Sequence, residues 1–274
     1  AGESTRVSYI GVNAGPVKIE SNQNIVVTER VIYKVNNVNT SFTEMMALPE
    51  KQLDMTYYLP WYNNVGLDTQ LRIANVTDQP ATVTVTIGGI PQTPINLAAG
   101  ASTSVSYTGV DNGPVKIESN QNIVASERLI YKVSGVNTSF AEMMALPDNQ
   151  LSTTYWIPWY NNVGLDTQLR IANVSNSTAT VDVYIGGEKM TDSPFTLDAG
   201  ESIRVSYLNV DNGPVQIVSD VPIVAAERLI YRVNGVQTSF SELMGLPDSL
   251  LDSSFWFPWY NNLGMDSQLR FGVP

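Results

Sequence analysis

Short stretches in which apolar and polar residues alternate dominate this chain, and turn residues separate them. Many of the apolar positions hold Val, Ile or Tyr, which favour strands. Such alternation predicts β-strands that bury one face. In the second half of the chain the predicted strands are residues 168–173, 180–185, 202–207, 215–219 and 223–233. Gly88-Gly89 and Gly186-Gly187 lie between such stretches and predict tight hairpin turns.

One recurring segment departs from this alternation. Residues 41–49 read Ser-Phe-Thr-Glu-Met-Met-Ala-Leu-Pro, and close variants follow at 139–147 and 239–247. A Ser three residues before Glu, with a Pro at the end, predicts a helix of one or two turns. Phe140, Met143 and Met144 would then share a face that covers an open edge of a sheet. A methionine-lined ligand groove is the alternative.

The chain contains an internal sequence repeat. Residues 61–76 recur unchanged at 159–174, and a third version occupies 259–274. Tyr9, Tyr107 and Tyr207 are separated by 98 and then 100 residues. A unit of this length can bury its own core, unlike the shorter repeats of solenoids. We therefore expect an all-β protein made of tandem antiparallel sandwiches, each with one short helix.

Composition excludes several classes of function. The net charge of −11 repels nucleic acid and anionic lipid, so neither is an expected partner. No apolar run approaches the roughly 20 residues of a membrane span. Histidine and cysteine are absent, which excludes a histidine-dependent triad, a thiol nucleophile and ordinary zinc sites. We predict that the protein is not an enzyme and needs no cofactor or metal, although Asp68, Asp166 and Asp266 beside Asn pairs leave calcium open.

The order of motifs carries a resemblance. Successive copies contain LRIANV, ATV(T/D)V(T/Y)IGG, an AGxSxxVSY-type segment, GPV(K/Q)I and IV(A/V)(S/T/A)ER(L/V)IY. This order resembles the tandem immunoglobulin-like β-sandwich repeats of bacterial extracellular and cell-surface proteins. The resemblance covers nearly the whole chain. It implies a seven-strand-type sandwich, domains joined end to end and no intrinsic catalysis, and such sandwiches serve structural, adhesive and sugar-binding roles.

The repeat can be divided into domains in two ways. Counting from Gly2, Gly100 and Gly200 leaves the third copy one hairpin short. Counting from the aromatic stretch gives two whole domains, 55–152 and 153–252, which we prefer because an immunoglobulin-like unit begins with a strand leading into LRIANV. Residues 1–54 are then the later strands of a partial domain, and residues 253–274 are the leading strands of a further one.

These incomplete ends would expose strand edges and apolar faces, which native proteins avoid. We expect residues 255–271 of one subunit to complete the sandwich begun by residues 1–54 of the next, giving a head-to-tail filament by strand complementation. The joined halves would still lack a strand equivalent to residues 181–185. Two alternatives stay open: the ends result from truncation or processing, or they pack within their own chain.

An aromatic cluster recurs in every copy. Its members alternate along a predicted strand, so both faces carry large apolar area. One face is expected to fill the core and the other to pack between domains or subunits; a sugar-stacking platform is the alternative. The residues concerned are Tyr57, Trp61, Tyr155, Trp156, Trp159, Phe255, Trp256 and Trp259.

Charged residues also stand where the strand pattern expects apolar ones. Glu29, Glu127 and Glu227 share a face with apolar neighbours, and a buried lone carboxylate is costly. We predict structural ion pairs between these glutamates and arginines. The candidate arginines are Arg72, Arg170 and Arg270; the alternative is an adjacent arginine of the Arg128 type on a crossing strand.

Asn-X-Ser/Thr triplets permit glycosylation in a secreted protein. They occur at Asn39, Asn75, Asn137, Asn173 and Asn176. Taken together, the sequence predicts an extracellular structural repeat protein that forms a stalk, sheath or filament and binds copies of itself. A cell-surface adhesin or carbohydrate-binding array, with glycan as partner, is the alternative.

Overall fold

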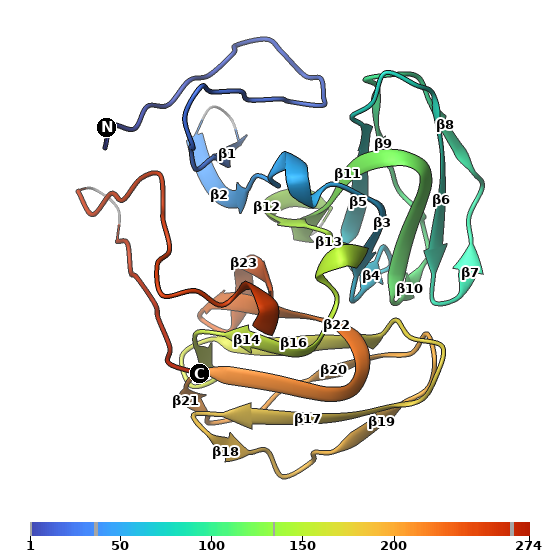
Figure 1. Cartoon of the computed structure of the whole chain (residues 1–274). Coiled ribbons are helices and arrows are strands. Elements are labelled where there is room, and N and C mark those ends of the chain that lie inside the picture. The colour runs from blue at the N-terminus through green and yellow to red at the C-terminus, as the bar shows by residue number, and fades with distance from the viewer. Residues whose placement is uncertain (1, 36–37, 134, 264–265) are drawn as a thin grey trace.

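The computed structural model describes residues 2–35, 38–133, 135–263 and 266–274. The described chain is all-β, with antiparallel pairing throughout and no α-helix (Figure 1). Two nine-stranded sheets, each folded over on itself as a sandwich, are formed by strands between residues 54 and 147 and between 152 and 247. We call them the first and the second sandwich. None of the described segments is a helix with the length and apolarity needed to cross a membrane.

The two sandwiches have matching strands. The first contains β3 (Asp54–Leu59), β5 (Asp68–Asn75), β6 (Ala81–Ile87), β7 (Ile90–Pro91), β8 (Ile95–Leu97), β9 (Ser102–Val105), β11 (Val115–Val133), β12 (Val136–Met144) and β13 (Leu146–Pro147). The second contains β14 (Ser152–Ile157), β16 (Asp166–Asn173), β17 (Ala179–Ile185), β18 (Glu188–Lys189), β19 (Phe195–Leu197), β20 (Ser202–Val205), β22 (Val215–Val233), β23 (Val236–Met244) and β24 (Leu246–Pro247).

Three smaller strand pairs complete the described fold. These are β1 (Thr28–Val35) with β2 (Val38–Met46), β4 (Tyr62–Asn63) with β10 (Asp111–Asn112), and β15 (Tyr160–Asn161) with β21 (Asp211–Asn212). A single 3₁₀ turn follows each repeat of the Met-containing segment: η1 (Glu50–Gln52), η2 (Asp148–Gln150) and η3 (Asp248–Leu250).

One 19-residue strand joins the two layers of each sandwich. The first part of β11, from Val115, pairs with β3 and β6, and the part from Ile123 onward pairs with β5 and β12. The register with β3 shifts between Glu118 and Ile123, where the strand passes from one layer to the other. β22 repeats this arrangement. The core lies between the two layers.

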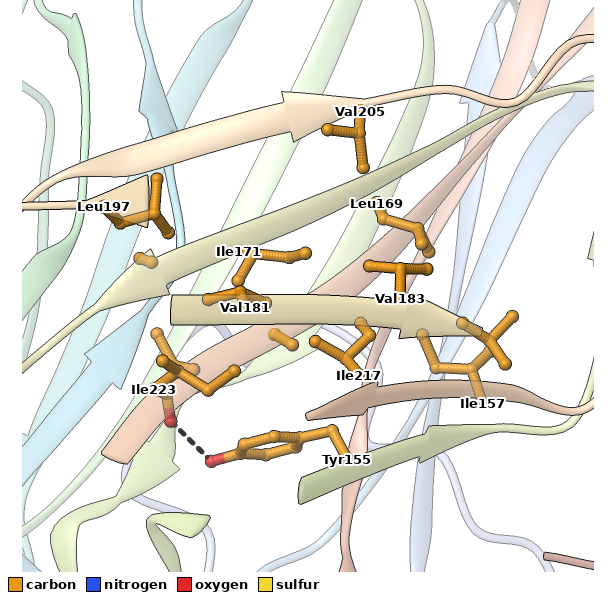
Figure 2. Close-up of a cluster of buried hydrophobic side chains, with 14 of the residues drawn as sticks. Tyr155, Ile157, Leu169, Ile171, Val181, Val183, Leu197, Val205, Ile217 and Ile223 are labelled. Carbon is orange, nitrogen blue, oxygen red and sulfur yellow. Dashed lines mark hydrogen bonds between the residues drawn. The ribbon is translucent and has the colours of Figure 1, made fainter. Parts of the chain in front are cut away.

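Alternation along the strands fills this core. In Figure 2 the apolar side chains of β14, β16, β17 and β22 point toward one another in the second sandwich. Tyr155 is fully buried, and its hydroxyl donates a hydrogen bond of 2.8 Å to the carbonyl of Ile223 (Figure 2). The predicted hairpin turns are confirmed, because Gly88, Gly89, Gly186 and Gly187 all have positive φ.

The helix predicted for residues 41–49 is wrong. Residues 41–46 belong to β2, and the equivalent segments belong to β12 and β23. The spacing of Phe140 and Met143 fits a helix, but on a strand these side chains point to opposite faces. Met143 enters the core of the first sandwich, whereas Phe140 packs against Tyr33 outside it. Both faces of this strand are therefore used.

Three β-hairpins pack in a row, and in Figure 1 they lie to the left of the first sandwich and above the second. Hairpin 1 is β1 with β2; hairpin 2 is β12 with the end of β11 from Ser126; hairpin 3 is β23 with the end of β22 from Ala226. Hairpin 2 packs against both of the others.

Partial copies of the repeat lie at the two chain ends, and we refer to them together as the split third copy. In their described parts, residues 2–27 and 251–274 form no strand; in Figure 1 the first segment runs across the top of the view, and the second passes down the left side to the second sandwich. β1 has 8 residues, whereas β11 and β22, which share its sequence pattern, have 19. The missing part of β1 corresponds to the part of β11 that pairs with β3 and β6.

Candidate functional site

The contacts between neighbouring hairpins follow one pattern, and we call each such contact a seam. Tyr33 of hairpin 1 meets Phe140 of hairpin 2 edge to face, with ring centroids 5.6 Å apart. Tyr131 of hairpin 2 meets Phe240 of hairpin 3 in the same way at 5.8 Å. Edge-to-face aromatic pairs add about 0.5–1.5 kcal/mol beyond the burial of their area.

Serine hydroxyls repeat the pattern. The Ser139 hydroxyl lies 3.2 Å from that of Ser41 and 3.3 Å from that of Ser239, so it forms hydrogen bonds to both neighbouring hairpins. In the first seam the Glu142 amide also donates to the Thr43 hydroxyl at 3.2 Å. Each hairpin is thus held to the next by an aromatic contact and a hydroxyl contact at equivalent positions.

An apolar cluster fills the second seam. Leu129 and Ala141 are fully buried against Ile230 and Phe240, which are 8% exposed. Leu67 and Tyr131 pack onto the edge of this cluster. The cluster is distinct from the two sandwich cores, so hairpin packing is a third element of the fold.

Ion pairs cross the strands within each hairpin. They are Arg30–Glu44, Arg128–Glu142 and Arg228–Glu242. The exposed fraction of the arginine side chain is 31% in hairpin 1, 20% in hairpin 2 and 8% in hairpin 3. The exposed fraction of the glutamate side chain is 45%, 5% and 5% in the same order. A pair in hairpin 2 or 3 is covered by the preceding hairpin, whereas the pair in hairpin 1 is not.

The predicted Glu–Arg partners lie near each other across successive copies. The charges of Glu29 and Arg72, of Glu127 and Arg170, and of Glu227 and Arg270 interact. None of these three pairs forms an ion pair in the described structure; the arginines that do so follow the glutamates in sequence. Their partners Glu44, Glu142 and Glu242 belong to the Ser-x-x-Glu pattern that suggested a helix cap, so the signal was present but assigned to the wrong element.

Two of the predicted glutamates are buried without a hydrogen bond to one carboxylate oxygen. Burial, reinforced by the nearby charge of Glu242, raises the pKa of Glu127 well above its ordinary value. Burial raises the pKa of Glu227 to about 8, and the charge of Arg270 opposes this increase. Because ionisation is unfavourable here, we expect the stability of hairpins 2 and 3 to depend on pH.

The predicted aromatic cluster is divided among several roles. Tyr57 and Tyr155 are core residues with no exposed area. Trp61 donates from Nε1 to Asp111 at 2.7 Å, and the Arg170 guanidinium of the second sandwich lies 4.9 Å from its ring. Trp156 and Trp159 donate to Asp248 and Asp211. Trp61 is therefore the member that contacts the next sandwich.

The C-terminal members of this cluster are exposed. Phe255, Trp256 and Trp259 are 60%, 77% and 54% accessible to solvent. The contrast with the earlier copies extends through the core positions. Tyr155, Ile157 and Ile171 are at most 1% exposed, whereas their counterparts Phe255, Phe257 and Phe271 are 60%, 69% and 88% exposed.

The N-terminal segment shows the same contrast. Val215, Ile217 and Ile223 are fully buried in β22. Their counterparts Val17, Ile19 and Ile25 are 80%, 56% and 53% exposed. Core residues of a third sandwich are thus present at both ends of the chain and lack the packing that the first two sandwiches provide.

Burial corrects part of the glycosylation prediction. Asn75 and Asn173 are fully buried, and their amide nitrogens donate to carbonyls of nearby turns at 2.7–3.1 Å. A glycan has no room there in the folded protein. Asn176 is exposed and Asn137 partly buried, while the side chain of Asn39 lies outside the described part of the structure.

The residues considered for calcium have other neighbours. Asp68 forms an ion pair with Lys132 at 3.2 Å, and Asp166 pairs with Arg232. Within residues 2–35, 38–133, 135–263 and 266–274, no group of three or more acidic residues is arranged to hold a metal ion. The Asn63 side chain instead accepts hydrogen bonds from the amides of the turn that follows it.

A cavity of about 820 Å³ lies between hairpins 1 and 3. Phe42 and Ile32 line one wall, and Leu229 and Tyr231 line the other. Arg6 and Asn261, from the two end segments, also contribute to the lining. The cavity therefore lies where the exposed halves of the third copy approach each other.

The chain matches no family model and no curated protein sequence. Among solved structures it aligns with a GH2 β-galacturonidase from Eisenbergiella tayi bound to galacturonate, at 12% identity and a TM-score of 0.18. The alignment covers 81% of this chain and 43% of that chain. At this TM-score the likeness supports no argument about fold or activity.

Proposed function

We propose that this is an extracellular structural repeat protein, built of tandem immunoglobulin-like domains at 55–152 and 153–252, that assembles head to tail with copies of itself. The observation that carries the proposal is the split third copy. Its core residues are exposed at both chain ends, although the same positions are buried in the two complete sandwiches. A large exposed apolar surface of this kind marks an interaction site.

The pairing pattern of the complete sandwiches indicates how the halves would join. In the first sandwich β3 pairs with the early part of β11, with Tyr57 opposite Ile117. The counterparts of these residues are Phe255 in the C-terminal segment and Ile19 in the N-terminal segment. If residues 255–271 of one copy paired with residues 17–27 of the next, β1 would extend toward the length of β11.

Completion of the third sandwich would be strongly favourable. Burying one large apolar side chain contributes about 1.5–3 kcal/mol, and several are exposed in each half.

One observation favours a second candidate, a carbohydrate-binding array. Trp256 and Trp259 are exposed next to the amides of Asn261 and Asn262, and planar aromatic residues of this kind stack on sugar rings. The equivalent Trp156 and Trp159 already donate hydrogen bonds to aspartates. Quenching or a shift of tryptophan fluorescence on titration with polysaccharides would support this function.

Light scattering after size exclusion tests the assembly. We expect the whole chain to form oligomers whose mass rises with protein concentration, and electron microscopy of the same sample to show linear particles. Phe257→Glu and Ile19→Glu each place a charge in one half of the predicted contact and are expected to give monomers. Both positions are exposed in the single chain, so folding should be unaffected.

The matched control is Val163→Glu, which changes an apolar residue in an exposed loop of the second sandwich that is 65% accessible. This variant should assemble like the original chain. A protein that stays monomeric at its highest soluble concentration, or assembly that is insensitive to both Glu substitutions, would contradict the proposal.

A further inference from the structure

Each hairpin has two different faces, and both seams use them in the same order. On hairpin 2, Tyr131 lies opposite Ser139, and Ile130 lies opposite Phe140. Because neighbouring residues on a strand point to opposite faces, the Tyr and Ser share one face and the Ile and Phe share the other. In each seam the Tyr face of one hairpin meets the Phe face of the next.

Two faces are left over after these seams are formed. One is the Phe face of hairpin 1, with Ile32 and Phe42. The other is the Tyr face of hairpin 3, with Tyr231 and Leu229. Phe42 and Tyr231 are 53% and 52% exposed, whereas Phe140 and Phe240, inside the seams, are 4% and 8% exposed.

The leftover faces contain a complete counterpart of the second seam. Its apolar cluster consists of Leu67, Leu129, Tyr131, Ala141, Ile230 and Phe240. Each of these residues has an equivalent in the next copy of the repeat, if the first copy is taken to follow the third. The equivalents are Leu165, Leu229, Tyr231, Ser241, Ile32 and Phe42. All six line the cavity of about 820 Å³ between hairpins 3 and 1. The two faces therefore already point at each other.

The serine contacts indicate that the three hairpins are arranged around a common axis. The Ser139 hydroxyl is within 3.3 Å of those of both Ser41 and Ser239, and both Ser41 and Ser239 also line the cavity. Repeated use of one head-to-tail contact closes into a ring when the rotations add up to a full turn. Two steps of this contact have brought hairpin 3 back to hairpin 1, and between them lies the cavity, which Arg6 and Asn261 of the end segments also line.

We infer that hairpins 1 and 3 of the same chain bind each other through a third seam, with Tyr231 against Phe42, and that the three hairpins form a closed ring. Ring closure would cover the Arg30–Glu44 pair, as the Arg128–Glu142 and Arg228–Glu242 pairs are covered in hairpins 2 and 3. The occupant of the exposed Tyr face is therefore hairpin 1 of the same chain.

The ring does not depend on the proposed assembly. Hairpin 1 begins after residue 27, and hairpin 3 ends before residue 251. Residues 255–271 lie outside both hairpins, so pairing with another copy requires that Asn261 leaves the cavity and Arg270 leaves Glu227. A closed ring would hold hairpin 1 in a fixed position. It would thereby also position the N-terminal half of the third sandwich, which directly precedes hairpin 1 in the chain.

Cross-linking between introduced thiols tests the third seam, because the chain has no cysteine of its own. The test variant is Phe42→Cys with Tyr231→Cys, treated with a short bis-maleimide. The reference is Phe240→Cys with Tyr131→Cys, whose parent rings are 5.8 Å apart. The negative control is Tyr231→Cys with Ile90→Cys, since β7 lies at the far edge of the first sandwich (Figure 1).

We expect cross-linking within one chain, with a yield within about twofold of the reference, both in the original background and in the monomeric Phe257→Glu background. A yield at the level of the negative control would overturn the inference. So would products that join only different chains, because the faces would then bind another copy. Failure of assembly without loss of the internal cross-link would reject the proposed function and leave the ring standing.

Thermal unfolding provides a second measurement that needs no cross-linker. In the Phe257→Glu background, Tyr231→Ala should lower the unfolding temperature by an amount similar to Tyr131→Ala, because both tyrosines would lie in closed seams. Phe42→Ala together with Tyr231→Ala should lower it by less than the sum of the two single shifts. Additive shifts, or no shift for Tyr231→Ala, would show that the seam is open.

Discussion

The second sandwich and the split third copy contain nearly the same residues but bury them differently. Tyr155 and Ile157 are inaccessible in β14, whereas Phe255 and Phe257 at the equivalent positions are mostly exposed. The alternating pattern that predicts a strand is present in both. The difference shows that such a pattern becomes a strand only when neighbouring strands are available to pair with its backbone and cover its apolar face.

The largest effect that would test this comparison is a loss of core packing. Tyr155→Ala should destabilise the folded chain by about 3–5 kcal/mol, because it leaves a cavity in a close-packed core. Phe255→Ala should change the stability of the single chain by no more than about 0.5 kcal/mol. Denaturant unfolding of both variants in the Phe257→Glu background measures the difference, and similar losses would show that the C-terminal segment is packed.

The hydrogen bonds of the Tyr155 hydroxyl can be separated from packing. Tyr155→Phe removes the donation to the Ile223 carbonyl and the hydrogen bond accepted from the Ser152 amide, and should cost about 1–2 kcal/mol. A loss as large as that of Tyr155→Ala would mean that the unpaired carbonyl, rather than the loss of ring packing, accounts for most of the destabilisation.

An effect smaller than that of Tyr155→Ala is expected from the ion pairs of the covered and uncovered hairpins. Arg228→Met leaves Glu242 and Glu127 in a buried site with less positive charge, and should cost about 3 kcal/mol at pH 8. The same change at Arg30, in the uncovered hairpin, should cost less than about 1 kcal/mol. Equal losses in urea titrations would contradict the difference in burial between hairpins 1 and 3.

A further difference between the hairpins concerns pH. The pKa of Glu227 is raised to about 8 in the folded chain, so between its ordinary value and about 8 the folded state holds a proton that the unfolded state has lost. Stability should therefore fall as pH rises through this window. Glu227→Gln should raise stability at pH 8 by at least about 1.4 kcal/mol, the value of a tenfold change in proton affinity.

The control for the pH experiment is Glu29→Gln. Glu29 occupies the equivalent position in hairpin 1 but is exposed. Its substitution should change the stability at pH 8 by no more than about 0.5 kcal/mol. A Glu227→Gln variant with the pH slope of the original chain would show that the carboxyl group is solvated in the folded state.

Local sequence pattern predicted most of the strands and the glycine hairpins, since each depends on a few adjacent residues. It failed at residues 41–49, where a Ser-x-x-Glu pattern and apolar spacing are compatible with a helix as well as a strand. The decision came from distant residues: Glu142 pairs with Arg128, and Phe140 meets Tyr33. The hairpin seams were not predicted for the same reason, because no local pattern specifies which exposed face meets which.

The 19-residue strand also affects the order in which the chain can fold during synthesis. β11 pairs only with strands of its own sandwich. When it is synthesised, its partners β3, β5 and β6 have already left the ribosome, and β12 follows directly. The first sandwich can therefore close before the nearly identical strands of the second exist to compete for the same partners. Residues 251–274 emerge after the strands of both sandwiches, whose pairing positions are then already occupied.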